Sequence, residues 1–249
     1  MLAGVSVEYY TRLERGNAAG VSEDVLEGVT RALQLDEAER AHLFDLVRAA
    51  STVHLTRRRP SQERVRPTVQ RILESITAPA YVRNGRLDLL AANALGAALY
   101  APIFDSATGT PNTARFIFLS PQASEFFDNW ERIANDAVAI LRAEAGRDPY
   151  DKRLSDLIGE LSTRSDEFRV RWAAHNVKFH RTGAKTLHHP VVGDLTLDYE
   201  ALDLPGDEGQ RILVYSAEPG SRSQEALDLL ASWAATPTAA RADHSADER

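Results

Sequence analysis

Residues 195–200 read Leu-Thr-Leu-Asp-Tyr-Glu, so that Leu195, Leu197 and Tyr199 alternate with three polar residues. Successive side chains of a β-strand point to opposite faces of the sheet. The alternation therefore predicts a strand that packs one face on a core and leaves the other face in water. Strands of this kind are typical of antiparallel sheets.

Two neighbouring segments have a similar character. Val177 and Phe179 alternate with polar residues, and residues 211–216 hold a continuous apolar centre. Both segments are therefore predicted to be strands. The connecting turns are predicted at residues whose backbone favours turns, namely Gly183, Gly193 and Pro205-Gly206.

The dipeptide Asn84-Gly85 lies between two apolar runs within residues 81–90. Asn and Gly readily adopt the positive φ of a tight turn, which makes this pair a strong local signal for a β-hairpin. It predicts two more strands ahead of a block of helices.

Apolar residues at helical spacing predict the remaining elements. The predicted helices cover residues 65–76, a short segment after Asn93, and residues 116–119, 130–141, 154–161, 165–175 and 227–234, whereas residues 101–113 are predicted to be a loop. Two strands, a helical block, three strands and a helix indicate an α+β domain around one antiparallel sheet. A small sheet with helices across one face is a PAS-like plan, which tends to leave a cavity between its layers.

The N-terminal residues 3–16 read Ala-Gly-Val-Ser-Val-Glu-Tyr-Tyr-Thr-Arg-Leu-Glu-Arg-Gly, which is the pattern of the second half of a helix-turn-helix. Gly4 suits the turn between two helices, and Ser6 is a good N-cap for the second helix. A recognition helix reads base edges in the major groove with its outward residues. The residues predicted to contact duplex DNA are Val7, Glu8, Thr11, Arg12 and Arg15.

Each of these side chains has a chemical role at DNA. Glu8 can accept a hydrogen bond from a cytosine amino group, and Arg12 can pair with guanine. Val7 or Thr11 can touch a thymine methyl group, whereas Arg15 is better placed for phosphate. The pattern therefore predicts DNA binding, with an ordinary amphipathic helical pair as the alternative.

The stretch resembles the XRE family of helix-turn-helix regulators. The resemblance rests on Gly4-Val5-Ser6, on Tyr10 and Leu13 in the core, and on Glu14-Arg15-Gly16. The following residues also fit, with Ser22 as a cap, an apolar stripe of Val25, Leu26, Val29 and Leu33, and a capping-box-like pair of Asp36 and Glu39. The family has two helices before the Gly4 position, so we expect a truncated motif in which Met1 is an internal methionine of a longer reading frame.

Composition restricts the class of protein. The 249 residues carry a net charge of −7 and no cysteine, which excludes a disulfide framework and thiolate metal sites and fits a reducing cytoplasm. No apolar run reaches membrane-spanning length, so no membrane partner is expected. Because the chain is acidic, affinity for DNA has to come from the local placement of arginine.

The domain organisation follows from these segments. Residues 1–50 are predicted to be a partial helix-turn-helix domain, residues 51–62 a linker, residues 63–236 a second domain, and residues 237–249 a disordered tail. The linker holds Arg57-Arg58-Arg59, which can lie along a DNA backbone or simply be solvated.

The second domain resembles the MmyB-like ligand-binding domain. The resemblance rests on an ordered series of motifs, namely Glu160 to Ser165, Phe168-Arg169, Trp172-Ala173, His175, His180, Gly183, Lys185, His189-Pro190, Val192 to Leu195, Tyr199-Glu200 and Ala217 to Ser221. The family usually has Asp where this chain has Asn176. The resemblance implies a PAS-like sensor that holds a fatty-acid-like or other elongated apolar ligand and follows an XRE-type helix-turn-helix.

Catalysis and metal binding have little support in the sequence. His188 and His189 are adjacent, so in a strand they face opposite sides and cannot share one ion. No Gly-x-Ser-x-Gly, P-loop or Gly-x-Gly-x-x-Gly motif is present. We therefore expect neither an enzyme nor a cofactor.

A ligand site is easier to predict, because pockets combine apolar walls with a few polar groups. The predicted ligand-binding residues are Phe168, Arg171, Trp172, His175, Phe179, His180 and Tyr199. The aromatic residues would form the walls and Arg171 or a histidine would meet a carboxylate. Ordinary core packing is the alternative for each aromatic residue.

Together these features predict a cytoplasmic, ligand-responsive transcription regulator. Its partners would be duplex DNA, a small apolar or fatty-acid-like ligand and a second copy of the chain, because such DNA binders are commonly two-fold symmetric. The alternative is a ligand-binding or interaction protein that has lost DNA binding through truncation.

Overall fold

The computed structural model describes residues 6–18, 20–51, 64–174, 182–207 and 209–235. Its strands are β1 (Ala80–Arg83), β2 (Leu89–Ala92), β3 (Thr182–His189), β4 (Gly193–Asp203) and β5 (Arg211–Ser216). Its helices are α1 (Val7–Glu14), α2 (Glu23–Leu33), α3 (Glu37–Ser51), α4 (Pro67–Ser75), α5 (Ala94–Leu99), α6 (Ala101–Asp105), α7 (Thr113–Leu119), α8 (Ala123–Phe126), α9 (Trp130–Arg147), α10 (Lys152–Arg164), α11 (Asp166–Ala173) and α12 (Arg222–Ala235).

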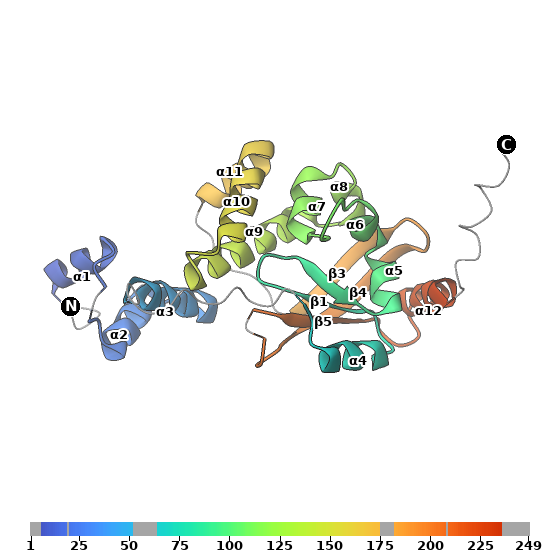
Figure 1. Ribbon diagram of the computed structural model, residues 1–249, viewed down its shortest axis with the longest axis horizontal. Helices are drawn as coiled ribbons and strands as arrows, with labels where there is room; N and C mark the ends of the chain where they lie inside the picture. Colours follow the sequence, from blue (N-terminus) through green and yellow to red (C-terminus); the bar gives the residue numbers. More distant parts are fainter. Residues whose placement is uncertain (1–5, 19, 52–63, 175–181, 208, 236–249) are drawn as a thin grey trace.

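The five strands form one antiparallel sheet in the order β2-β1-β5-β4-β3 (Figure 1). The α+β class and the PAS-like plan predicted from the sequence are therefore confirmed. Leu195, Leu197 and Tyr199 of β4 are buried and their polar neighbours are exposed, as the alternation requires. We call the face of the sheet that carries these three residues the inner face.

Two apolar layers enclose the sheet. The inner face packs against the large core that α5 to α11 cover, and α12 adds Leu227 and Leu230 at its edge. On the other face, Val69 and Leu73 of α4 pack on β1 and β5 (Figure 1). No helix in the described ranges is both long and apolar enough to cross a membrane.

Local chemistry accounts for most of the helix starts. Ser6 accepts a hydrogen bond from the Tyr9 amide at 3.2 Å and so caps α1. Asp36 and Glu39 form the reciprocal capping box of α3, with both bonds at 2.9 Å. Ser165 caps α11 through the Phe168 amide at 3.2 Å.

Several local expectations were wrong. Leu33, which was predicted to lie in the apolar stripe of its helix, is about half exposed, because α2 buries a narrower stripe than predicted. Ser22 makes no side-chain capping bond. Residues 101–105 form α6, because Pro102 stands in the first turn, where a proline has no amide bond to lose.

Gly183 was expected in a turn and lies elsewhere. It lies inside β3 and pairs with Tyr199, although its φ is +143°. Among the described residues, a Cβ at this position would meet a single atom within 4 Å, Cε1 of Tyr199 at 3.8 Å. Gly183 therefore leaves space beside the Tyr199 ring on the inner face. The predicted strand around Val177 and Phe179, the linker and the tail fall outside the described residues.

Asn93 joins β1, β2 and α5 at one buried point. Its side-chain oxygen accepts from the amides of Ala80 at 3.1 Å and Gly96 at 2.7 Å. Its amide nitrogen donates to the carbonyls of Ile76 at 2.8 Å and Ala78 at 2.7 Å. One side chain thus satisfies four backbone groups, of which each costs about 1–3 kcal/mol if it is left buried without a partner.

We predict that Asn93→Ala lowers the free energy of unfolding by about 3 kcal/mol, because several backbone groups lose their partners together. Urea unfolding followed by circular dichroism measures the change. Asn129→Ala is the matched control, since Asn129 is exposed and caps α9 with a single bond. It should cost about 1 kcal/mol. Equal losses in the two variants would contradict the role assigned to Asn93.

Candidate functional site

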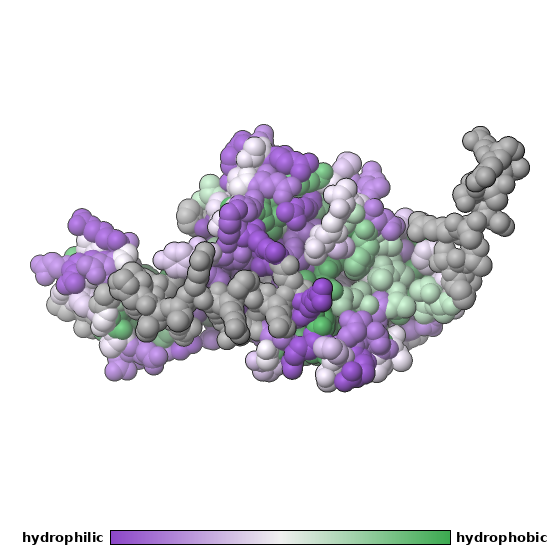
Figure 2. Space-filling view, in the orientation of Figure 1, coloured by the Kyte–Doolittle hydropathy of each residue, from purple (hydrophilic) through white to green (hydrophobic). Residues whose placement is uncertain are grey.

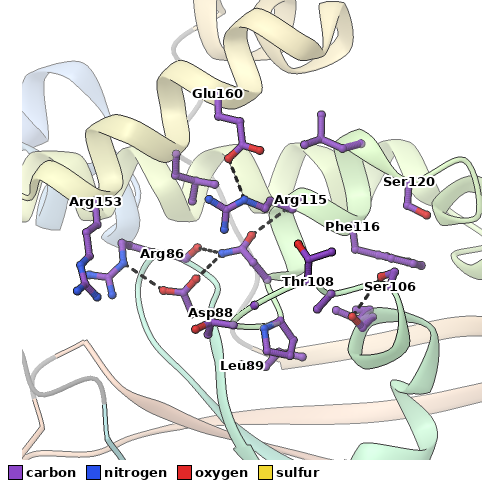
Figure 3. A pocket seen from close by; sticks show the side chains of 18 of the residues that line it. Arg86, Asp88, Leu89, Ser106, Thr108, Arg115, Phe116, Ser120, Arg153 and Glu160 are labelled. Carbon is purple, nitrogen blue, oxygen red and sulfur yellow. Dashed lines mark hydrogen bonds and ion pairs between the residues drawn. The ribbon is translucent and has the colours of Figure 1, made fainter.

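The structure contains an open groove of about 1260 Å³ between the β1–β2 turn, the α6–α7 loop and α10 (Figure 3). Leu89, Ile103 and Phe116 lie at its base and are themselves buried. Charged side chains, including Arg86 and Arg115, lie around them. This groove is the first candidate for a ligand site.

The groove's charges are largely paired with one another. Arg86 bonds to Asp88 at 3.1 Å, and Arg115 bonds to Glu160 at 2.8 Å (Figure 3). Arg86 also bonds to Asp151 at 2.9 Å. Asn112 completes the network with a 2.7 Å bond to Asp88. A ligand that took one of these arginines would break a salt bridge of the network, although Glu160 would keep its pairing with Arg164. The network therefore serves to hold the hairpin turn, α7 and α10 together.

A second candidate lies on the inner face of the sheet, where three buried tyrosines meet. The hydroxyl of Tyr215 on β5 lies 2.7 Å from that of Tyr100 and 3.1 Å from that of Tyr81 on β1. Burial raises the pKa of Tyr215 and of Tyr100 well above the usual value, so both phenols stay protonated. The three hydroxyls form a fixed, uncharged hydrogen-bonding cluster.

Lys185 of β3 adds a cation to this cluster. Its ammonium donates to the Tyr215 hydroxyl at 3.3 Å and lies 4.5 Å from the ring centroid of Tyr199 and 5.6 Å from that of Tyr215. Ring faces attract cations, so these contacts replace part of the lost hydration. Within the described part of the chain, no carboxylate forms a salt bridge with this ammonium.

The surroundings of Lys185 shift its proton equilibrium. The residue is only partly buried as a whole, but the pKa of its ammonium is lowered to about 8, mainly by desolvation and further by the nearby charges of Arg83 and Arg132, against a rise from Asp136. Burial also lowers the pKa of Arg83. At pH 7 the ammonium therefore remains mainly charged. We call Lys185, Tyr81, Tyr100, Tyr199 and Tyr215 the lysine–tyrosine cluster.

The structure places the predicted ligand residues in two groups. Phe168 is fully buried and stacks on the partly buried Trp172, with 5.6 Å between the two ring centroids. The guanidinium of Arg171 lies over the ring of Trp130. These three form the packing between α11 and α9. Tyr199 lies in the lysine–tyrosine cluster instead. The other predicted residues, His175, Phe179 and His180, fall outside the described residues.

The predicted DNA-contacting residues lie on or next to α1. Val7 is 79% exposed, Glu8, Arg12 and Arg15 are exposed, and Thr11 is partly buried, with its hydroxyl bonded to the Val7 carbonyl. They therefore occupy an accessible face. No residue of α1 is buried, so this short helix packs loosely on its neighbours.

The two adjacent histidines separate as the strand geometry requires. His189 is buried and bonds to the Ala98 carbonyl at 3.0 Å, whereas His188 is exposed beside Asp194 at 2.7 Å. Burial lowers the pKa of His189, and the hydrogen bond to Asp194 raises that of His188. The described residues contain no group of three or more side chains suited to a metal ion.

The sequence analysis missed most of the lysine–tyrosine cluster. Tyr81 and Tyr215 lie on predicted strands, but their approach depends on the pairing of β1 with β5, whose members are far apart in the chain. Lys185 was named only among the motifs of the family resemblance and not as a site residue. A lysine on an otherwise apolar strand face was the sequence signal that could have predicted its role.

Comparison with known proteins covers the second domain. A family model described as the MmyB-like transcription regulator ligand binding domain matches residues 65–230. This range includes the sheet, the lysine–tyrosine cluster and α4 to α11. A search of curated proteins found no match.

We predict that Lys185 titrates near pH 8, because its ammonium is desolvated. The chain contains only three lysines, so nuclear magnetic resonance of lysine-labelled protein resolves them individually. Lys152 is the internal control: it is exposed, and its bond to Asp156 raises its pKa above the ordinary value. An ordinary pKa for Lys185, near that of a free lysine, would contradict the buried position of its ammonium.

Proposed function

The chain belongs to the MmyB-like transcription regulator ligand binding domain family, and from this premise we propose that it is a DNA-binding regulator controlled by a small amphiphilic, fatty-acid-like ligand. The family supports a regulator with a ligand-binding domain. The observation that carries the ligand's chemistry is the ammonium of Lys185 beside the phenol of Tyr215. A carboxylate would supply the negative charge that this cation lacks among the described residues.

The inner face offers the matching apolar contacts. Leu197 pairs directly with Lys185 across β3 and β4, and Leu187 and Leu195 are fully buried on the same face. A chain of methylene groups gains about 0.8 kcal/mol for each one it buries. An elongated ligand with one anionic end therefore fits this face better than a compact, fully polar one.

The groove is a weaker candidate for the same ligand. Its arginines already bond to carboxylates, so an incoming anion would compete with Asp88, Asp151 and Glu160. Among the described residues no carboxylate forms a salt bridge with Lys185, although the charge of Asp136 acts on its ammonium. The balance of charge favours the lysine–tyrosine cluster.

We predict that dodecanoate binds the full chain and that Lys185→Met weakens binding by about 10- to 100-fold. A hydrogen bond to a charged group contributes about 1.5–3 kcal/mol, and each 1.4 kcal/mol is about tenfold in affinity. Affinity should also fall as pH rises above about 8, because Lys185 loses its proton there. Isothermal titration calorimetry below the micelle concentration measures both effects.

Lys152→Met is the matched control, because Lys152 is exposed on α10 and pairs only with Asp156 among the described residues. It should leave dodecanoate affinity within twofold of wild type. Equal affinities in wild type and Lys185→Met would exclude this cluster as the head-group site. We also propose that the chain is not an enzyme, so dodecanoate recovered after incubation should be chemically unchanged.

DNA binding is the second part of the proposal. Its support is the accessible row of Val7, Glu8, Arg12 and Arg15 on a helix capped by Ser6. Outward residues of a recognition helix contact base edges and phosphates. We propose that two chains act together as a homodimer on a two-fold site, and light scattering of the protein with DNA tests that assembly by its mass.

We predict that the full chain binds a duplex from upstream of its own gene and that Arg12→Ala weakens this binding by about tenfold. Loss of a good bidentate base contact costs about 1–3 kcal/mol. Fluorescence anisotropy at two salt concentrations measures the affinity, which should fall with salt. Arg222→Ala on α12 is the control, because Arg222 is exposed and outside the proposed interface. Equal losses in both variants would argue against recognition through α1.

One observation favours a second function. Because α1 buries no residue, packing does little to fix its orientation. If α1 does not hold the orientation that DNA recognition requires, the chain is a ligand-binding or interaction protein without DNA activity. Dodecanoate binding with no salt-sensitive binding to DNA would select this alternative.

A further inference from the structure

Helix α9 contacts both the sheet and helix α3. It spans 18 residues, which at 1.5 Å per residue is about 27 Å. Its first half lies over the inner face near β3, and its second half packs against α3 (Figure 1). One continuous helix therefore contacts the strand that carries Lys185 and α3, and α3 packs in turn on α2, which follows the proposed DNA-binding helix α1.

The first half of α9 is tied to the strand that carries Lys185. Arg132 donates a hydrogen bond from its Nη2 to the carbonyl of Ala184, the residue immediately before Lys185. Asp136 and Arg132 both lie close enough to influence the charge of the Lys185 ammonium. A ligand head group at Lys185 would thus act on the same short stretch of β3 that holds α9.

The second half of α9 forms a close joint with α3. A Cβ on Gly146 would lie 2.6 Å from Cε1 and 2.8 Å from Nδ1 of His42, and 3.6 Å from Cδ2 of Leu46. The absence of a side chain at Gly146 is therefore what admits the His42 ring. Nδ1 of His42 is buried and has no hydrogen-bond partner among the described residues.

Arg142 connects this joint to α11. Its guanidinium stacks on the Trp172 ring at 4.3 Å and donates to the Trp172 carbonyl. It also lies near enough to His42 for its charge to lower the pKa of that ring, after the larger effect of burial, while Asp45 of α3 raises it. The His42 ring is therefore neutral at pH 7 and packs as an uncharged group.

The second half of α9 also rests on two turns of the sheet. A Cβ on Gly85 in the β1–β2 turn would overlap the Glu144 carboxylate, and one on Gly209 in the β4–β5 turn would overlap the Arg147 guanidinium. A shift of the sheet relative to α9 would therefore displace Glu144 and Arg147, which flank Gly146. These two contacts connect the sheet to α3 by a second route through α9.

We propose that the His42–Gly146 joint is the interdomain coupling surface: the C-terminal half of α9 docks α3, and ligand at Lys185 changes how firmly it does so. The inference rests on the proposed function, since it joins the proposed ligand and DNA sites. A ligand shifts such an equilibrium only by binding the docked and undocked arrangements differently. Couplings between sites are typically about 5- to 150-fold in affinity.

The first test is Gly146→Ala. The added methyl group forces the His42 ring away from α9, although alanine by itself favours a helix over glycine. We expect amide hydrogen exchange in α3 to become about tenfold faster, because docking protects these amides. The effect of dodecanoate on DNA affinity should fall from at least about fivefold to within twofold.

Gly159→Ala is the matched control, because Gly159 is an exposed glycine in α10 and a Cβ there meets no atom of the described residues within 4 Å. It should change neither the rate of amide hydrogen exchange in α3 nor the effect of dodecanoate on DNA affinity. In the double variant His42→Ala/Gly146→Ala the ring that clashes is gone, so part of the α3 protection should return. Dodecanoate affinity measured without DNA should stay within about threefold of wild type in all three variants.

A change of pH tests the same joint without a substitution. His42 has a lowered pKa when docked, so protonation favours the undocked arrangement as pH falls below about 6.5. After correction for the intrinsic pH dependence of exchange, α3 protection should be lower at pH 5.5 than at pH 7.5. His42→Ala should remove this pH effect.

The proposal is overturned if Gly146→Ala leaves both α3 exchange and the dodecanoate effect on DNA as in wild type. If wild type binds neither dodecanoate nor DNA, the proposed function fails and the exchange measurements alone decide whether the joint docks α3. Normal binding of both with no mutual effect in wild type refutes the coupling while leaving the proposed function intact.

Discussion

A desolvated ammonium on the inner face of the sheet is the constraint around which the second domain is organised. Among the described residues, Lys185 is held by one phenol and two ring faces rather than by a salt bridge to a carboxylate. Desolvation that no salt bridge offsets is costly, which is why the pKa of Lys185 falls to about 8 although Asp136 raises it. A protein keeps such an unfavourable group most readily where a ligand offsets it, and local violations of packing rules concentrate at functional sites.

Buried neighbouring side chains keep that group in place. The bonds among Tyr81, Tyr100 and Tyr215 fix the acceptor for Lys185, and Asn93 fixes β1 and α5, from which Tyr81 and Tyr100 extend. In Figure 2 hydrophilic side chains cover much of the exposed surface over the N-terminal helices, α10 and α11, and hydrophobic ones gather toward α5 and α12. The buried cluster is therefore a polar site enclosed by an otherwise apolar core.

The fold could be predicted from local patterns, but the site depended on distant pairing. The alternation at 195–200 and the Asn84-Gly85 pair correctly indicated β4 and the first hairpin. The hairpin turn itself differs, because Leu87 rather than Gly85 takes the positive φ and Asn84 accepts from the amides of Arg86 and Asp88. The approach of Lys185 to Tyr215 requires the register of β3, β4 and β5 together, which no single segment reveals.

The central claim is that the ammonium of Lys185 receives the anionic end of the ligand. The most direct measurement is the pKa of Lys185 by lysine-selective nuclear magnetic resonance in the free chain and at saturation with dodecanoate. A carboxylate placed beside an ammonium favours its charged form. We therefore expect the pKa to rise clearly above about 8 on binding. Saturation with dodecanoate that leaves the pKa of Lys185 unchanged would show that its ammonium does not receive the carboxylate.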